Sequence, residues 1–324
     1  MRRHYIYAVI APIFWSIAGV VVKSLEVSTE WQINFYRCGA LAIFVALVIV
    51  FRYRRSAFSV IRAGGAKALF AGGLLSGAMV CNIVALKYTT VAVAVFLMAA
   101  APVFAALLAK IFLGEKTDGR VWLSIALAFI GIAIMVGSRL QVGDTIGVAV
   151  ATLGIIFFGA YAVSLRVGKS LDMTPAVFYG GVFGAGIGFT MSMIPGVGLV
   201  VPLGEAIWCA MLGVVQLGLG SVLFALAAQT VPAVQLTLFS LGEPVLAPLW
   251  VLIVLGEAPT GATLIGGVVL FFFTGAGAAQ AWNKYLLWRN AVEFGIKDPQ
   301  FGLDVSFFTF TLPWLREVLG FISS

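Results

Sequence analysis

The sequence contains very little charge. Of its 324 residues 10% are Asp, Glu, Lys or Arg, whereas 62% are hydrophobic, and the mean hydropathy is +1.09. About a quarter of the residues in a soluble domain are charged, so this chain does not have enough polar side-chain surface to cover a globule in water. The composition therefore predicts an integral membrane protein.

Histidine and cysteine are almost absent. His4 is the only histidine, so neither a Ser–His–Asp triad nor a histidine-bearing metal site is expected. Cys38, Cys81 and Cys209 stand far apart in apolar stretches, which predicts small buried side chains rather than a disulfide framework or a zinc site. We expect no metal and no cofactor.

Acidic residues are fewer than basic ones, 13 against 20, which gives a net charge of +7. A basic chain can bind nucleic acid through the phosphate backbone. Here the densest basic run, RYRR at 52–55, lies between two apolar stretches, as in a loop at the cytoplasmic face of a membrane. Nucleic-acid binding is therefore not expected.

Long apolar stretches dominate what remains. A transmembrane helix needs about 20 mostly apolar residues, and breaking the chain at charges, Gly and Pro predicts ten such segments. They are 5–23, 31–51, 68–87, 91–112, 119–138, 145–166, 175–195, 205–228, 232–255 and 260–282. With the N-terminus inside, thirteen Lys and Arg residues lie on the cytoplasmic side and only Lys23, Lys87 and Arg139 on the other. This asymmetry predicts that both termini are cytoplasmic.

One stretch of sequence occurs twice. PVFAALLAKIFLGE at 102–115 and PVLAPLWVLIVLGE at 244–257 are identical at eight of fourteen positions, at a constant offset of 142. The two copies belong to the fourth and ninth predicted helices, and an odd number of helices, five, inverts the second unit in the membrane. We expect an all-α membrane protein of two inverted five-helix repeats, over 1–139 and 144–282. Inverted repeats are a common plan of secondary transporters.

The remaining residues, 283–324, match neither repeat. Their apolar stretches are short and are interrupted by Asp304, Pro313 and the pair Arg316-Glu317. This pattern predicts a cytoplasmic or interfacial amphipathic tail, with an eleventh span as the alternative.

Several motifs resemble the drug/metabolite transporter superfamily in its EamA-type branch. They are WSIAGVVVKSL (15–25), Arg37 within NFYRCGAL, ALKYTTVAVAVFLMAAAPVF (85–104) and the two LGE endings. Size and layout look most like the YddG-type bacterial exporters of aromatic amino acids. The second unit departs from the pattern, because Phe157, Phe158 and Tyr161 stand where a second Trp is expected.

The resemblance implies a secondary transporter in the bacterial cytoplasmic membrane that exports small metabolites, amino acids above all, by alternating access. Organic cations, sugars and nucleotide sugars are alternative substrates on the same fold. The sequence has no P-loop and almost no convergent catalytic groups, so an ATPase or an intramembrane lipid enzyme is not expected. A channel is the third class considered. The expected partners are a small-molecule substrate and membrane lipid.

The candidate substrate-binding residues are polar or aromatic groups at membrane depth, which usually face a cavity or a neighbouring helix. They are Trp15, Arg37, Asn82, Tyr161, Gln216 and Glu243. Glu243 is the sharpest case, because it could hold an ammonium group or carry a proton, and Pro244 beside it should remove a helical hydrogen bond. The alternative for Glu243 is a structural carboxylate satisfied by a neighbouring helix.

For the other candidates a structural role is also open. Arg37 could hold a carboxylate, pair with Glu30 or extend its side chain to the membrane surface, and Asn82 could bond another helix. Gly180, Gly184 and Gly188 form a GxxxGxxxG ridge, which predicts close helix packing. Glu115 and Glu257 close the repeated motif, where we expect a local capping role after Gly114 and Gly256.

Overall fold

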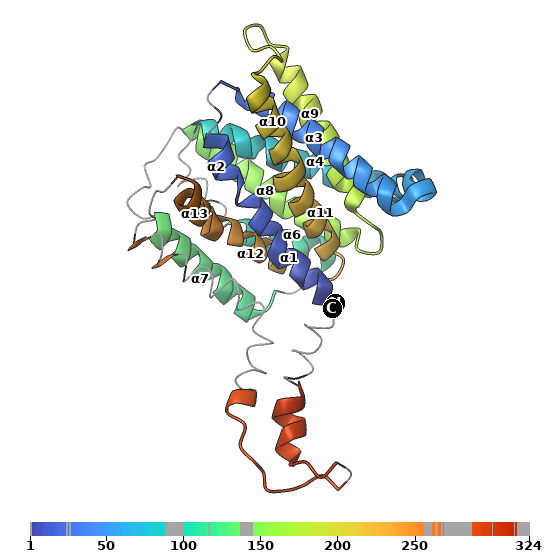
Figure 1. Ribbon diagram of the computed structural model, residues 1–324, viewed down its shortest axis with the longest axis vertical. Helices are drawn as coiled ribbons and strands as arrows, with labels where there is room; N and C mark the ends of the chain where they lie inside the picture. The colour runs from blue at the N-terminus through green and yellow to red at the C-terminus, as the bar shows by residue number, and fades with distance from the viewer. Residues whose placement is uncertain are drawn as a thin grey trace.

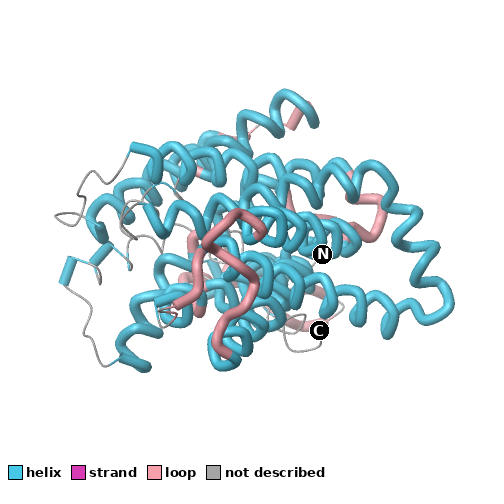
Figure 2. Tube along the Cα trace, turned by 90° about the horizontal axis from the view of Figure 1, so that it is seen from above, coloured by secondary structure: helices cyan, strands magenta, loops and turns pink. Residues whose placement is uncertain are grey.

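The computed structural model describes residues 2–23, 25, 27–88, 97, 100–115, 117–136, 145–255, 261–262, 265–266, 268, 287–299, 301–313 and 315. These residues are almost entirely helical, as Figures 1 and 2 show. The main helices are α1 (Arg2–Trp15), α2 (Ala18–Lys23), α3 (Glu30–Tyr53), α4 (Ala57–Tyr88), α6 (Ala101–Leu113), α7 (Gly119–Val136), α8 (Thr145–Val167), α9 (Thr174–Ser192), α10 (Leu203–Met211), the π-helix η3 (Leu212–Leu219), α11 (Gly220–Ala227), α12 (Ala233–Ser240) and α13 (Gly242–Leu255).

The predicted all-α class is confirmed, and helices coincide with the first nine predicted segments. The tenth segment, 260–282, lies almost wholly outside the described residues, as does Glu257. Local sequence explains the boundaries. Thr29 and Gln32 form a capping box at the start of α3. Gly114 ends α6 in the left-handed conformation, with φ 64°, as expected for a C-cap glycine.

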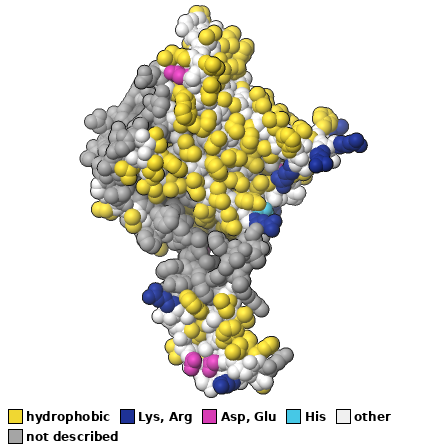
Figure 3. Space-filling view, in the orientation of Figure 1, with side chains coloured by type: hydrophobic (Ala, Val, Ile, Leu, Met, Phe, Trp, Pro, Cys, Tyr) yellow, Lys and Arg dark blue, Asp and Glu magenta, His cyan; other side chains and the backbone are white. Residues whose placement is uncertain are grey.

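The surface of the bundle is apolar. Four helical stretches are long and apolar enough to cross a membrane: Glu30–Leu86, Thr145–Val167, Leu203–Ala227 and Ala233–Val254. Hydrophobic side chains cover most of the face in Figure 3, whereas Lys and Arg gather at the tip where α3 meets α4. We call the end of the bundle that carries Arg52, Arg54 and Arg55 the basic end. The chain is a multi-pass membrane protein.

The glycine ridge of α9 packs backbone to backbone against α3. A Cβ atom at Gly188 would lie 2.6 Å from the Phe35 nitrogen, and one at Gly181 would lie 2.8 Å from the Ala42 nitrogen. At Gly184 the obstacle would be the Cys38 Sγ, 2.7 Å away. The predicted packing role of the ridge is thus confirmed, with Gly181 added to it.

Residues 287–313 lie beyond the lower end of the bundle in Figure 1. The Asp298 N–H donates to the Leu303 carbonyl at 2.8 Å, and the Val305 N–H donates to the Ile296 carbonyl at 2.9 Å. The Asp304 carboxylate accepts from the Phe294 and Ser306 amides, just before the π-helix η5 (Phe307–Thr311). The interfacial location predicted for this tail stays a prediction.

Replacing Gly188 by Ala should destabilise the protein by about 1–3 kcal/mol, because the added methyl group meets the α3 backbone and overpacks the contact. Gly186→Ala is the matched control on the same helix, since nothing lies within 4 Å of its Cβ position. Thermal unfolding in detergent should give a lower melting temperature for Gly188→Ala alone. Equal melting temperatures would refute the backbone contact.

Candidate functional site

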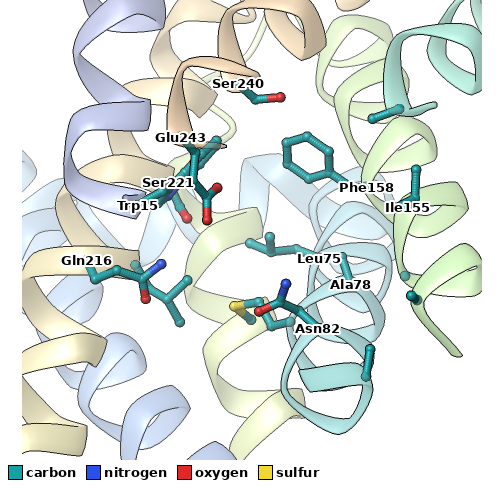
Figure 4. A pocket seen from close by; sticks show the side chains of 16 residues that line it. Trp15, Leu75, Ala78, Asn82, Ile155, Phe158, Gln216, Ser221, Ser240 and Glu243 are labelled. Atoms are coloured by element: carbon teal, nitrogen blue, oxygen red, sulfur yellow. The ribbon is translucent and has the colours of Figure 1, made fainter. Parts of the chain in front are cut away.

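A cavity lies in the middle of the bundle, lined by α1, α4, α6, α8, η3, α11, α12 and α13 (Figure 4). The cavity has a volume of about 120 Å³. One water needs roughly 10–15 Å³ of such volume. The cavity therefore has room for about ten waters, or for a ligand of about ten non-hydrogen atoms.

The helices that line the cavity are irregular where they meet it. The α1 helix ends at the lining residue Trp15, and α2 begins only at Ala18. The π-helical turn η3 contains the lining residues Gln216 and Leu217. Such turns occur often at functional sites, and helix breaks at membrane depth are tolerated where they line a cavity.

The sharpest break separates α12 from α13. The lining residues Ser240 and Glu243 stand on either side of it, with Leu241 between the two helices. The Ser240 hydroxyl donates to the Thr237 carbonyl at 2.6 Å, which satisfies one carbonyl at the end of α12. Glu243 lies in the first turn of α13, where the helix dipole favours a negative charge.

This break corrects the expectation for Pro244. The proline was expected to remove a hydrogen bond from the middle of a continuous helix. Because α13 begins at Gly242, Pro244 instead lies in its first turn, where a backbone N–H has no intrahelical acceptor to lose. Pro102 occupies the equivalent position at the start of α6.

The cavity has two chemically different walls in Figure 4. We call Gln216, Ser221, Ser240 and Glu243 the polar wall; they come from η3, α11, α12 and α13. We call Leu75, Ala78, Ile155 and Phe158 the apolar wall; they come from α4 and α8. Asn82 on α4 adds one amide next to the apolar wall, and its side chain points toward the cavity.

Four of the six predicted residues line the cavity together: Trp15, Asn82, Gln216 and Glu243. The side chains of Gln216 and Glu243 point into it in Figure 4. Gln216 is 5% exposed, and its Oε1 atom has no hydrogen-bond partner in the part of the chain that the structure describes. An unsatisfied buried amide oxygen is costly.

Tyr161 does not line the cavity. It is fully buried and stacks on Phe224, with ring centroids 6.0 Å apart. Phe224 in turn lies 5.2 Å from the Trp15 ring, centroid to centroid. Phe158, one helical turn before Tyr161, is the α8 aromatic that reaches the cavity, and it contacts Trp15 at 5.8 Å. Tyr161 therefore supports Trp15 through Phe224.

Arg37 does not line the cavity either. Its side chain is 1% exposed, so it does not extend to the membrane surface, and its Nη2 donates to the Met79 carbonyl at 3.3 Å. The ion pair with Glu30 is not formed; the Glu30 carbonyl accepts from Asn34 instead. Arg37 fastens α3 to α4 behind the lining residue Met79.

Sequence reasoning missed the lining residues Leu75, Met79 and Ser240. Helical spacing from Asn82 could have found the first two, since residues three and seven positions earlier share its face. Ser240 lies three positions before Glu243, but the helix is broken at Leu241 between them. Helical spacing therefore does not predict where the Ser240 side chain points.

Ion pairs join the two halves of the chain at the basic end. Glu115, after α6, pairs with Arg166 of α8 at 3.4 Å, and Arg166 also donates to the Gln229 carbonyl at 3.0 Å. This ion pair joins α6 to α8, and the capping role expected for Glu115 stays a prediction.

A second cluster at the same end surrounds Asp172, between α8 and α9. Its carboxylate accepts from the Tyr53 hydroxyl and the Thr174 amide and lies 3.5 Å from the Arg52 guanidinium. Burial would raise the pKa of Asp172, but the hydrogen bonds from Thr174 and Tyr53, together with Arg52, outweigh burial and hold that pKa below its ordinary value. The carboxylate is thus stabilised in its charged form.

Asp172→Asn should lower the stability by about 1 kcal/mol at pH 7, because the ion pair and part of the hydrogen bonding are lost. Since folding lowers the pKa, this stabilisation is present above the ordinary carboxyl pKa of 3.8 and is lost as the pH falls through the lowered value. Melting temperatures of the two proteins should therefore converge in acid. Asp118→Asn, an exposed carboxylate between α6 and α7, is the control; an identical drop there would refute the role of the cluster.

The fold is that of a helical membrane protein with a cavity inside the helical bundle. Two protein families each match one part of the chain. Residues 2–137 match the EamA-like transporter family, which indicates membrane transport. Residues 181–324 match an uncharacterised protein family, UPF0182. The expected EamA-type resemblance is therefore confirmed for the first half, and the second match runs through the predicted boundary at 282.

Curated relatives are similar over short stretches. A UPF0182 protein of Streptomyces coelicolor is 48% identical over 69 residues, 21% of this chain and 7% of that protein. One of Arthrobacter sp. is 52% identical over 62 residues, 19% of this chain and 6% of that protein. The chain thus spans less than a tenth of the length of these relatives.

One solved crystal structure resembles the whole fold. The two superpose with a TM-score of 0.73 at 17% sequence identity, over 86% of this chain and 98% of the other. At this identity the likeness concerns the arrangement of the helices.

Proposed function

We propose that this protein is a secondary transporter that carries small amphipathic metabolites across the cytoplasmic membrane by alternating access. The observation that carries the proposal is the central cavity, which both halves of the chain line at breaks in their helices. Discontinuous helices at membrane depth are the usual way in which transporters expose polar groups to a substrate. The EamA-like match over residues 2–137 supports the same function.

Helix packing supports two inverted five-helix units. The contact between α4 and α8 corresponds to the contact between α11 and α1. In the same way, the contact between α4 and α9 corresponds to that between η3 and α3. Likewise, α6 packs on α8 as α12 and α13 pack on α1. If the two units are exchanged, the first contact of each pair becomes the second. This relation is the one that lets the two halves of an inverted repeat swap conformations.

The lining of the cavity follows the same relation. Leu75 and Leu217, Met79 and Ser221, and Ala101 and Glu243 all line it, and the members of each pair are 142 residues apart, the offset of the repeated motif. Equivalent positions of both halves thus line one cavity, which supports the inverted-repeat arrangement.

Metabolites with an amino group are the substrate class that we propose, amino acids such as phenylalanine among them. Glu243 supplies a carboxylate for the ammonium group, and the apolar wall accepts a hydrophobic body. The proposal includes no catalytic step.

Purified protein in liposomes loaded with unlabelled phenylalanine, methionine or threonine should take up the labelled solute by saturable counterflow. An imposed pH gradient should be tested in parallel, because a response to it that Glu243→Gln abolishes would mean proton coupling. Flux that rises linearly with concentration and shows no counterflow would contradict a transporter and indicate a channel.

Filling the cavity should stop transport. Ala78→Phe places a ring in the apolar wall and should lower the counterflow rate about tenfold or more, because a well-packed site cannot absorb the added volume. Leu69→Phe, on an exposed position of the same helix, is the matched control and should transport normally. Normal counterflow in Ala78→Phe would place the substrate elsewhere.

A further inference from the structure

Hydrogen-bond acceptors dominate the polar wall of the cavity. Glu243 is the only ionisable side chain among the lining residues that the structure describes. The amide of Gln216 is the neighbouring polar group, and its Oε1 atom is buried without a partner among the described residues. The hydroxyl of Ser240 is already donated to the Thr237 carbonyl, which leaves its oxygen free to accept. A group that only donates, such as an ammonium, matches this set.

The cationic groups that could hold a carboxylate are placed elsewhere. Arg37 is sealed behind Met79, to whose carbonyl it donates, so it contributes positive charge at a distance but no hydrogen bond to a ligand. The indole nitrogen of Trp15 lies against Gly220, where an added Cβ would be only 2.3 Å away. A carboxylate in the cavity would therefore lose its hydration without gaining a charged partner, which is costly.

The charge is also one-sided. At the position equivalent to Glu243 the first unit has Ala101, and at the position equivalent to Ser221 it has Met79. Equivalent positions around the cavity therefore carry apolar side chains in the first unit and charged or polar side chains in the second. An amphipathic ligand can lie in it in one orientation only, with its cation toward α13 and its apolar body toward α4 and α8.

We propose that the cavity selects amphipathic amines over the corresponding amino acids, with the ammonium group held by Glu243 and the apolar body held by Leu75, Ile155 and Phe158. This inference rests on the proposed transport function and narrows its substrate class. The carboxylate of an amino acid weakens binding at this site, and an anion with the same body is excluded.

Three probes with the same ring test the inference: phenethylamine, phenylalanine and 3-phenylpropionate. Their binding to the full-length protein in lipid nanodiscs is measured by isothermal titration calorimetry. Phenethylamine should bind about tenfold or more tightly than phenylalanine, which is the scale of a desolvated charge without a partner, and 3-phenylpropionate should not bind. Equal or tighter binding of phenylalanine, or binding of 3-phenylpropionate, would overturn the inference.

Two variants identify the recognising group. Glu243→Gln should weaken phenethylamine binding about tenfold or more, because a charge-assisted hydrogen bond is lost. Glu243→Asp keeps a carboxylate at the same position and should retain more of the affinity than Glu243→Gln. Thermal melts show whether each variant is folded. Affinity that survives Glu243→Gln in a folded protein, or a folded Glu243→Asp variant that binds no better than Glu243→Gln, would contradict recognition by the Glu243 carboxylate.

The outcome separates this inference from the proposed function. If phenylalanine shows counterflow and binds better than phenethylamine, transport stands and selection for amines fails. If none of the three probes binds and none shows counterflow, both fail. Should Glu243→Gln not fold, the ranking of the three probes on the unaltered protein decides the matter alone.

Discussion

A backbone amide or carbonyl in hydrocarbon must find a hydrogen-bond partner within the protein, so a membrane helix can be interrupted only where protein or a water-filled space receives the freed groups. This constraint accounts for the location of the site. The break between Trp15 and Ala18, the π-helical turn around Gln216 and the break between Ser240 and Gly242 all border one cavity. The polar groups of the site stand where the helices are discontinuous.

Outside the cavity the helices are packed closely. Away from the cavity, α3 and α9 approach each other so closely that Gly181 and Gly188 leave no room for a Cβ atom. Lipid provides no hydrophobic drive for such association, so close backbone packing has to supply it. The most extensive of these contacts joins the second predicted helices of the two halves, α3 and α9.

Much of this architecture could be predicted because the underlying signals are local or periodic. Apolar length marked the helices, and the GxxxGxxxG spacing marked the α9 seam. Asn82, Gln216 and Glu243 stood out because polar groups in apolar helices are costly. Direction around the helix axis was harder to predict. Arg37 and Tyr161 have the right depth, yet each turns toward a neighbouring helix, and Phe158 takes the place expected for Tyr161. The error over Pro244 arose from assuming a continuous helix.

The two halves of the chain differ in chemistry. The polar wall lies entirely within residues 181–324, which match the UPF0182 family, whereas the α4 part of the apolar wall lies within the EamA-like region. Among the described lining residues, the one carboxylate therefore belongs to the second half.

Alternating access around the cavity is tested most directly by distances at the two ends of the bundle. Spin labels at exposed Arg3 and Asp118 report on the basic end, and labels at exposed Ile146 and Leu203 report on the opposite end, all of them away from the α3–α9 seam. Distances in each pair are measured by double electron–electron resonance in liposomes that perform counterflow. The account predicts that the distance at one end lengthens as the distance at the other shortens. Distances that stay fixed, or that lengthen together, during active counterflow would contradict it.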